Sequence, residues 1–257
     1  MSASAETLLA LLSLGQAQVT ILFLVFLRVG AAMAVMPAFG EQSLPLRVRL
    51  AATLAFTAVV APAIADRPVP PVVAFAILPE VLAGLILGLG LRLLVMALQT
   101  AGAIAAQSTS VSQLFAGAAG EPQPAIGNLL TLAGLALAVS AGLHVQAARL
   151  LVLSYDILPP GRMPGAADAA AFGLARVAQA FGLAFTLAAP FAAAAMLYTL
   201  ATGVINRAMP QFMVALVGAP ALSFGALALL LLTAPALLAV WQSAMNAALA
   251  DPFGIAP

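Results

Sequence analysis

Charged residues are so sparse along the chain that they leave long apolar runs between them. Six long runs carry no charge, and they are Thr7–Leu27, Leu50–Ala65, Leu93–Gly120, Pro122–Ala148, Val177–Asn206 and Ala208–Ala250. A helix that spans a membrane needs roughly 20 mostly apolar residues, and several of these runs reach that length. The pattern therefore predicts an all-α protein of the multi-helix, integral membrane type.

The runs also predict where helices begin and end. We expect helices at about 7–36, 48–65, 72–105 and 125–154, with two or three more between 168 and 250. The last run would measure about 64 Å as one straight helix, which is about twice the hydrocarbon thickness of a bilayer. We therefore expect it to fold back or break, and Gly218-Ala219-Pro220 is the expected place.

Other breaks in the pattern are few. The clearest loop is Leu158–Gly165, which holds three prolines and two glycines. We find no soluble domain, no long linker and no convincing repeat, so the sequence predicts a single domain over residues 1–257. The first apolar run is not preceded by the basic residues of a cleavable signal peptide, and we expect it to be retained.

Prolines interrupt the apolar stretches, and two interpretations stay open for them. They are Pro37, Pro62, Pro79, Pro190, Pro220 and Pro235. Membrane helices tolerate proline, so the helices could be ordinary ones. Alternatively the helices form kinked or broken hairpins, which are tolerated at membrane depth only where the freed backbone is buried in protein or lines a cavity. The second interpretation favours a channel, a transporter or a packed assembly over a passive anchor.

Composition supports an apolar environment. The 257 residues are 64% hydrophobic and 7% charged, whereas a soluble globular domain carries about 25% charged residues. So few charges cannot cover the surface of a soluble protein of this size. The surroundings must be lipid or the interior of a larger assembly.

The residue types present exclude most enzyme chemistry. All nine basic residues are arginine, cysteine is absent and His144 is the single histidine. A phosphate-binding loop lysine, a Schiff base, thiol catalysis and a multi-histidine metal site are thereby excluded. No HExxH or GxSxG motif occurs. The arginines also form no basic stripe that could bind nucleic acid. We predict a non-enzymatic protein without cofactor or metal, and we expect His144 to be a hydrogen-bonded packing residue.

A few charged and polar residues fall in or beside apolar helices, where charges are expensive and usually face a partner. We expect contacts between helices or between subunits for Arg28, Glu80, Arg92, Arg207 and Gln211. Arg92 could instead extend from near a helix end to the polar boundary. Gly84 and Gly88 follow Glu80 at four-residue spacing, which predicts a surface where another helix packs closely.

The segment from about 107 to 124 is uncharged until Glu121 but rich in hydroxyls, amides and glycine. It is either an ordinary connection or a polar element that lines or closes a path, because its glycines allow several backbone conformations. The residues that would form such a gate are Gln107, Gln113, Phe115, Gly117, Gly120, Glu121 and Gln123.

Orientation in the membrane depends on one basic pair. Arg47 and Arg49 follow the first predicted helix. The positive-inside rule places this loop in the cytoplasm and the N-terminus outside.

Four segments together resemble the FliR/SctT family of export-gate components of bacterial flagella and type III secretion systems. They are Arg28 with Pro37–Gly40 and Pro45–Leu50; Glu80, Gly84 and Gly88 with the polar segment after them; His144 to Gly161; and Asn206–Gln211 with Gly218–Pro220. Their order and spacing agree with the family from about residue 20 to 240. One departure is Leu143, which stands where the family typically has glycine.

The resemblance implies a role and a set of partners. Family members join FliP-like and FliQ-like subunits, and sit with FlhB-like and FlhA-like proteins, to form the conduit for unfolded secreted substrates. It implies a multi-pass protein of the bacterial inner membrane and flagellar basal body, with broken hairpins packed in a helical assembly and in contact with lipid. A loop thought to help plug the closed channel corresponds by position to about 107–123.

Alternatives to a flagellar export subunit stay open. A virulence-type secretion subunit is hard to separate from a flagellar one by sequence. A small-molecule secondary transporter would also use broken helices and buried charges, but such transporters usually show a repeat. A purely structural membrane scaffold is the remaining alternative.

Overall fold

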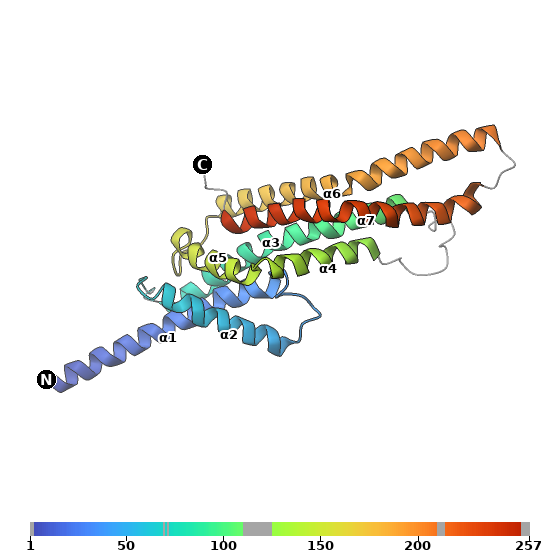
Figure 1. Ribbon diagram of the computed structural model, residues 1–257. Helices are drawn as coiled ribbons and strands as arrows, with labels where there is room; N and C mark the ends of the chain where they lie inside the picture. The colour runs from blue at the N-terminus through green and yellow to red at the C-terminus, as the bar shows by residue number, and fades with distance from the viewer. Residues whose placement is uncertain (1–2, 69, 71, 110–124, 210–213, 253–257) are drawn as a thin grey trace. The chain divides into compact units, whose positions relative to one another are not determined.

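The computed structural model describes residues 3–68, 70, 72–109, 125–209 and 214–252, which form seven α-helices and no strand (Figure 1). The all-α prediction is confirmed. In chain order the helices are α1 Ala3–Val35, α2 Leu46–Ala63, α3 Val73–Thr109, α4 Ala125–Ser140, α5 Leu143–Ile157, α6 Ala166–Ala208 and α7 Val214–Ala250.

The prediction of one helix over 125–154 is wrong, because Gly142 separates α4 from α5. Gly142 adopts φ +86°, in the left-handed region that suits glycine. Its N–H donates to the Val139 carbonyl at 3.1 Å, and its carbonyl accepts the first bond of α5 from the N–H of Val145 at 3.0 Å. The two helices form a bent pair around this residue.

The predicted break at Gly218–Pro220 is also wrong. Helix α7 continues from Val214 through these residues to Ala250, and the chain leaves α6 earlier, at Ala208. Two other prolines of the apolar stretches, Pro79 and Pro190, lie inside α3 and α6 without ending them. Long apolar helices tolerate proline where local adjustments and neighbours satisfy the freed backbone groups.

Within the part of the chain that the structure describes, five helices are long and apolar enough to cross a membrane. These spans are Gln18–Val35, Leu46–Ala63, Val73–Gln107, Ala166–Ala208 and Phe224–Ala250. The bent pair α4 and α5 provides a sixth if it counts as one broken span. The number agrees with a multi-pass protein built partly from broken helices.

The chain divides into two compact units. Unit 1 comprises Met1–Arg92, Val139–Arg176 and Asn246–Pro257, and unit 2 comprises Leu93–Ala138 and Val177–Met245. In unit 1, α1 packs against α2 and α2 against α5. Its fully buried side chains include Val25, Val29, Leu151 and the charged Arg28 and Glu80.

Unit 2 has an apolar core around Trp241, which is fully buried. The indole Nε1–H donates to the Leu94 carbonyl at 2.7 Å, so the one polar atom of the ring has a partner. Gly134 makes room for this core, because a Cβ there would lie 2.6 Å from Leu98 Cδ1. Arg207 is the one charged residue in the part of unit 2 that the structure describes.

Candidate functional site: a buried ion-pair network

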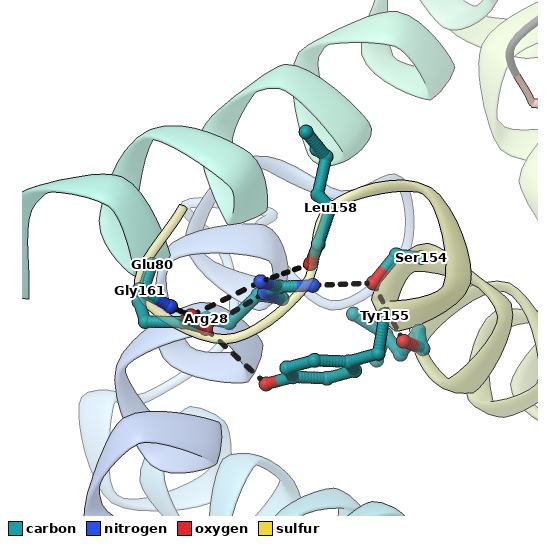
Figure 2. A network of polar contacts seen from close by, with 7 residues as sticks. Arg28, Glu80, Ser154, Tyr155, Leu158 and Gly161 are labelled. Carbon is teal, nitrogen blue, oxygen red and sulfur yellow. Dashed lines mark hydrogen bonds and ion pairs between the residues drawn. The ribbon is translucent and has the colours of Figure 1, made fainter. Parts of the chain in front are cut away.

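Arg28 and Glu80, both predicted from sequence to make polar contacts, lie against each other in unit 1. Helix α1 supplies Arg28, α3 supplies Glu80, and α5 with the loop after it supplies the remaining partners (Figure 2). Arg28 Nε donates to Glu80 Oε2 at 2.8 Å and Nη2 donates to Oε1 at 3.1 Å. The planar guanidinium thus holds the carboxylate in a two-point arrangement, which fixes its direction as well as its distance.

The rest of the Arg28 guanidinium is bonded to α5 and its following loop. Nη1 donates to Ser154 Oγ at 3.1 Å, and Nη2 donates to the Leu158 carbonyl at 2.8 Å. The guanidinium carbon also lies 3.6 Å from the centroid of the Tyr155 ring. A cation over an aromatic face is attracted by the ring quadrupole, so Tyr155 stabilises the charge as well as covering it.

Glu80 has two further donors. The Tyr155 hydroxyl donates to Oε2 at 3.3 Å and the Gly161 N–H donates to Oε1 at 2.9 Å. Gly161 adopts φ +74°, and a Cβ there would lie 2.9 Å from Pro70 Cγ. Glycine is required here on both grounds, because the backbone is left-handed and the space is filled. The Leu158–Gly161 loop is therefore fastened to both members of the ion pair.

Small residues let α3 approach α1 at this point. A Cβ added at Gly84 would collide with the Arg28 carbonyl, and one added at Gly88 would lie 2.6 Å from the Ala32 carbonyl. The GxxxG face of α3 thus packs directly on the α1 backbone. This close approach brings the Glu80 carboxylate, one turn before Gly84, within reach of Arg28.

Burial makes the network energetically consequential. Arg28, Glu80 and Ser154 are 0% exposed, and so is Tyr155. Taking both charges out of a polar environment is costly, and the mutual attraction offsets that cost only when the remaining donors and acceptors are also bonded. Here both charges have several partners. Removing one charge would leave the other uncompensated, at a cost of about 3–5 kcal/mol.

Two further ion pairs in unit 1 are more exposed. Arg92 donates to Glu41 at 2.5 Å, with side chains 27% and 24% exposed. Arg67 pairs with Asp156, with side chains 38% and 52% exposed. Exposed pairs contribute little, typically about 0–1 kcal/mol. Of these three pairs, Arg28–Glu80 therefore contributes most to the packing of unit 1.

The remaining predicted residues are not part of the network. Arg207 is exposed at the end of α6, and its side chain has no bond or ion pair within the described residues. Gln107 is exposed near the end of α3. His144 is exposed as well, so its prediction as a packing residue is wrong. The others lie outside the described residues: Gln113, Phe115, Gly117, Gly120, Glu121, Gln123 and Gln211.

Sequence reasoning missed four partners in the network. The Ser154 and Tyr155 side chains belong to α5, and Leu158 and Gly161 contribute through their backbones. Every residue has a backbone carbonyl and nearly every residue a backbone N–H, so the amino-acid sequence does not show which of them will bind a buried charge. The Pro-Pro-Gly sequence that ends at Gly161 was a signal for a tight loop, but not for its partner.

The network suits packing rather than catalysis. The Ser154 hydroxyl donates to the Leu151 carbonyl at 2.6 Å and accepts from Arg28, so no base is placed to activate it. No group of three or more histidine, cysteine, aspartate or glutamate side chains that could hold a metal occurs among the described residues. The network instead holds α1, α3, α5 and the loop after α5 in fixed positions relative to one another.

Known proteins align with nearly the whole chain. Residues 19–248 match the family described as bacterial export proteins, family 1. The flagellar biosynthetic protein FliR of Caulobacter vibrioides is 36% identical over 233 residues, which is 87% of this chain and 92% of that protein. FliR of Escherichia coli K12 is 28% identical over 76% of each chain. FliR of Bacillus subtilis 168 is 28% identical over 77% of this chain and 79% of its own.

The matched region runs through the arginine, glutamate and serine of the buried network and includes the Arg207 segment at the end of α6. It leaves only short terminal stretches unmatched. The chain belongs to family 1 of the bacterial export proteins.

Proposed function

We propose that this protein is a non-enzymatic subunit of the flagellar type III export apparatus and forms part of the conduit for unfolded flagellar proteins. The family match over residues 19–248 and the relatives named as flagellar biosynthetic proteins carry the proposal. Its apolar helices agree with a multi-pass position in the bacterial inner membrane. Because α3, α6 and α7 contribute to both units, we treat residues 1–257 as one functional domain.

The α6 surface supports membership of an assembly. From Ala192 to Met209 no residue is buried, and the large apolar side chains there are 44–70% exposed, from Ile205 to Val204. Such a surface is unstable in water and must be covered by lipid or by another protein. A conduit subunit that completes its packing against neighbours accounts for it.

We infer that the neighbours are FliP-like and FliQ-like subunits, with FlhB-like and FlhA-like proteins beside them. Arg207 is the one charged residue among the described residues of unit 2. An unpaired charge on an apolar helix usually faces a partner. Arg207→Glu should abolish recovery of the complex on co-purification. Arg149→Glu is the matched control, because Arg149 is also exposed and has no described partner. An intact complex with Arg207→Glu would remove this residue from the interface.

The polar segment is proposed as the gate on the strength of the resemblance alone. Deleting residues 113–120 should leave the complex assembled but make the membrane leaky to small solutes. Permeability equal to that of the wild type, in a complex shown to be assembled, would contradict a plug.

The proposed function itself is tested by deleting the gene. Cells without it should assemble no filament and secrete no flagellar subunits, and a plasmid copy should restore both. Filaments on the deletion strain would contradict the proposal. Loss of a virulence-type secretion with normal filaments would assign the protein to that related system instead.

A further inference from the structure

Helix α5 carries charged side chains on the face that it turns away from unit 1. Its buried residues all lie on the opposite side, and they are Leu143, Ala147, Leu150, Leu151, Ser154 and Tyr155. At about 100° per residue, the outer face is centred on Val145, Arg149 and Asp156. All three are exposed, Val145 by 46% and the Asp156 side chain by 52%. Two opposite charges therefore lie about 10 Å apart along one exposed helix face.

Arg149 distinguishes this face from the other helix surfaces. Of the described charged residues, it is the one that is exposed and lies more than one turn from both ends of its helix. It rises roughly 9 Å from Leu143 and 12 Å from Ile157, so it does not extend from a helix end to a polar boundary. Charges within membrane-spanning segments face a bundle interior or a water-filled cavity, because lipid solvates them poorly. The outer face of α5 is therefore not covered by lipid along its whole length.

The break at the start of α5 points to the same surroundings. Helices α4 and α5 together form one broken candidate span, bent by 73° at this place. Ser140 and Ala141 are exposed there, and nothing lies within 4 Å of the Cβ position of Gly142. Non-helical backbone at membrane depth is tolerated only where it is buried in protein or lines a water-filled cavity. Since this chain does not bury the break, the backbone and the charges of α5 independently require a polar neighbour.

We propose that the outer face of α5 lines the water-filled conduit and contacts the unfolded chain during export, an inference that rests on the proposed function. Water satisfies Arg149, Asp156 and the open break together, whereas a covering subunit would have to supply a carboxylate for Arg149. The mixed composition also suits passage. A wholly apolar face would retain hydrophobic segments of a substrate, and charges of one sign would retain segments of the other sign. Val145 and Leu153 beside two opposite charges do neither.

Thiol labelling of the assembled complex in native membranes tests the proposal, because the chain has no cysteine of its own. Val145→Cys and Leu153→Cys place a thiol on the outer face of α5. Val59→Cys is the control, since Val59 is 62% exposed on the uncharged part of α2. A charged maleimide should label the two α5 positions at least about 10-fold faster than the control, because only the thiolate reacts and apolar surroundings keep a thiol protonated.

A stalled substrate separates the conduit from other aqueous surfaces. A flagellar subunit fused to a domain that cannot unfold should block labelling of both α5 positions, and the same subunit without that domain should not. Filament assembly verifies that each variant folds, and Val152→Cys on the same face replaces one that does not.

Three results would overturn the proposal. They are labelling no faster than at Val59→Cys, labelling that the stalled substrate leaves unchanged, and labelling of the detergent-purified protein but not of the complex. The last result would show that another subunit covers the face. Filaments on the gene-deletion strain would instead refute the proposed function, whatever the labelling.

Discussion

The contribution of the buried ion pair can be measured by a double-mutant cycle at Arg28 and Glu80. Methionine is the replacement at both positions, because it is apolar, flexible and of similar length to the side chains it replaces. Arg28→Met leaves Glu80 with the Tyr155 hydroxyl and the Gly161 N–H but without a positive charge. We expect this variant to lose about 3–5 kcal/mol of stability, the usual cost of an uncompensated buried charge.

Glu80→Met should cost a similar amount for the same reason. Arg28 would keep Ser154 and the Leu158 carbonyl but lose the carboxylate that neutralises it. Independent effects would add to about 6–10 kcal/mol in the double variant. The double variant buries no charge, and leaves chiefly the Leu158 carbonyl and the Gly161 N–H without partners, at about 1–3 kcal/mol each. We therefore expect a double-variant cost of about 2–6 kcal/mol and a coupling energy of about 4 kcal/mol.

The assay is unfolding of the full-length protein in dodecyl maltoside by added SDS, followed by far-ultraviolet circular dichroism. The control cycle uses Arg67→Met and Asp156→Met, an exposed pair in the same unit. Its coupling should stay below about 1 kcal/mol. Additive costs at Arg28 and Glu80, or a coupling no larger than in the control cycle, would refute the assignment of the pair as a packing determinant.

Three smaller changes test other contacts in the same assay. Gly84→Ala should destabilise strongly, since its Cβ would meet the α1 backbone, whereas Gly182→Ala should be neutral or slightly stabilising because nothing lies within 4 Å; equal effects would contradict the close helix approach. Trp241→Phe should cost about 0.5–1.5 kcal/mol for the lost bond to the Leu94 carbonyl, and no loss would show that the bond contributes nothing. Gly161→Ala should cost at least about 1 kcal/mol through its left-handed backbone, and an unchanged midpoint would rule out that conformation.

Helix positions could be predicted from sequence wherever a charge-free run was long enough that only a helix could accommodate it. The bounds of α2 and α3 differ from the expected 48–65 and 72–105 by a few residues. The break between α4 and α5 was missed, because Gly142 lies inside an uncharged run and only its left-handed backbone reveals the turn. Proline was a poor guide, since α7 continues through Gly218–Pro220.

The members of the site were predictable, but their pairing was not. An isolated charge in an apolar helix predicts a partner, which singled out Arg28 and Glu80. They are 52 residues apart in sequence. Which two helices pack together depends on how well the side chains along the full length of their surfaces fit each other. The GxxxG spacing at Gly84 and Gly88 predicted a close neighbour without naming α1. Which helix packs on this surface is decided by tertiary contacts that the spacing does not specify.

Length limits how much of α6 lipid alone can cover. Its charge-free stretch, Val177–Asn206, rises about 45 Å. Fitting 45 Å into a hydrocarbon core of about 30 Å needs a tilt of about 48°, beyond the 0–40° that membrane helices show. Lipid alone therefore cannot cover the stretch, and part of it must lie against protein. Part of that protein is this chain itself, because the first half of the stretch has buried residues at Ala180, Ala184, Leu187, Ala188 and Phe191. The end of α6 from Ala192 has no buried residue within the chain, so its cover comes from lipid or from another protein.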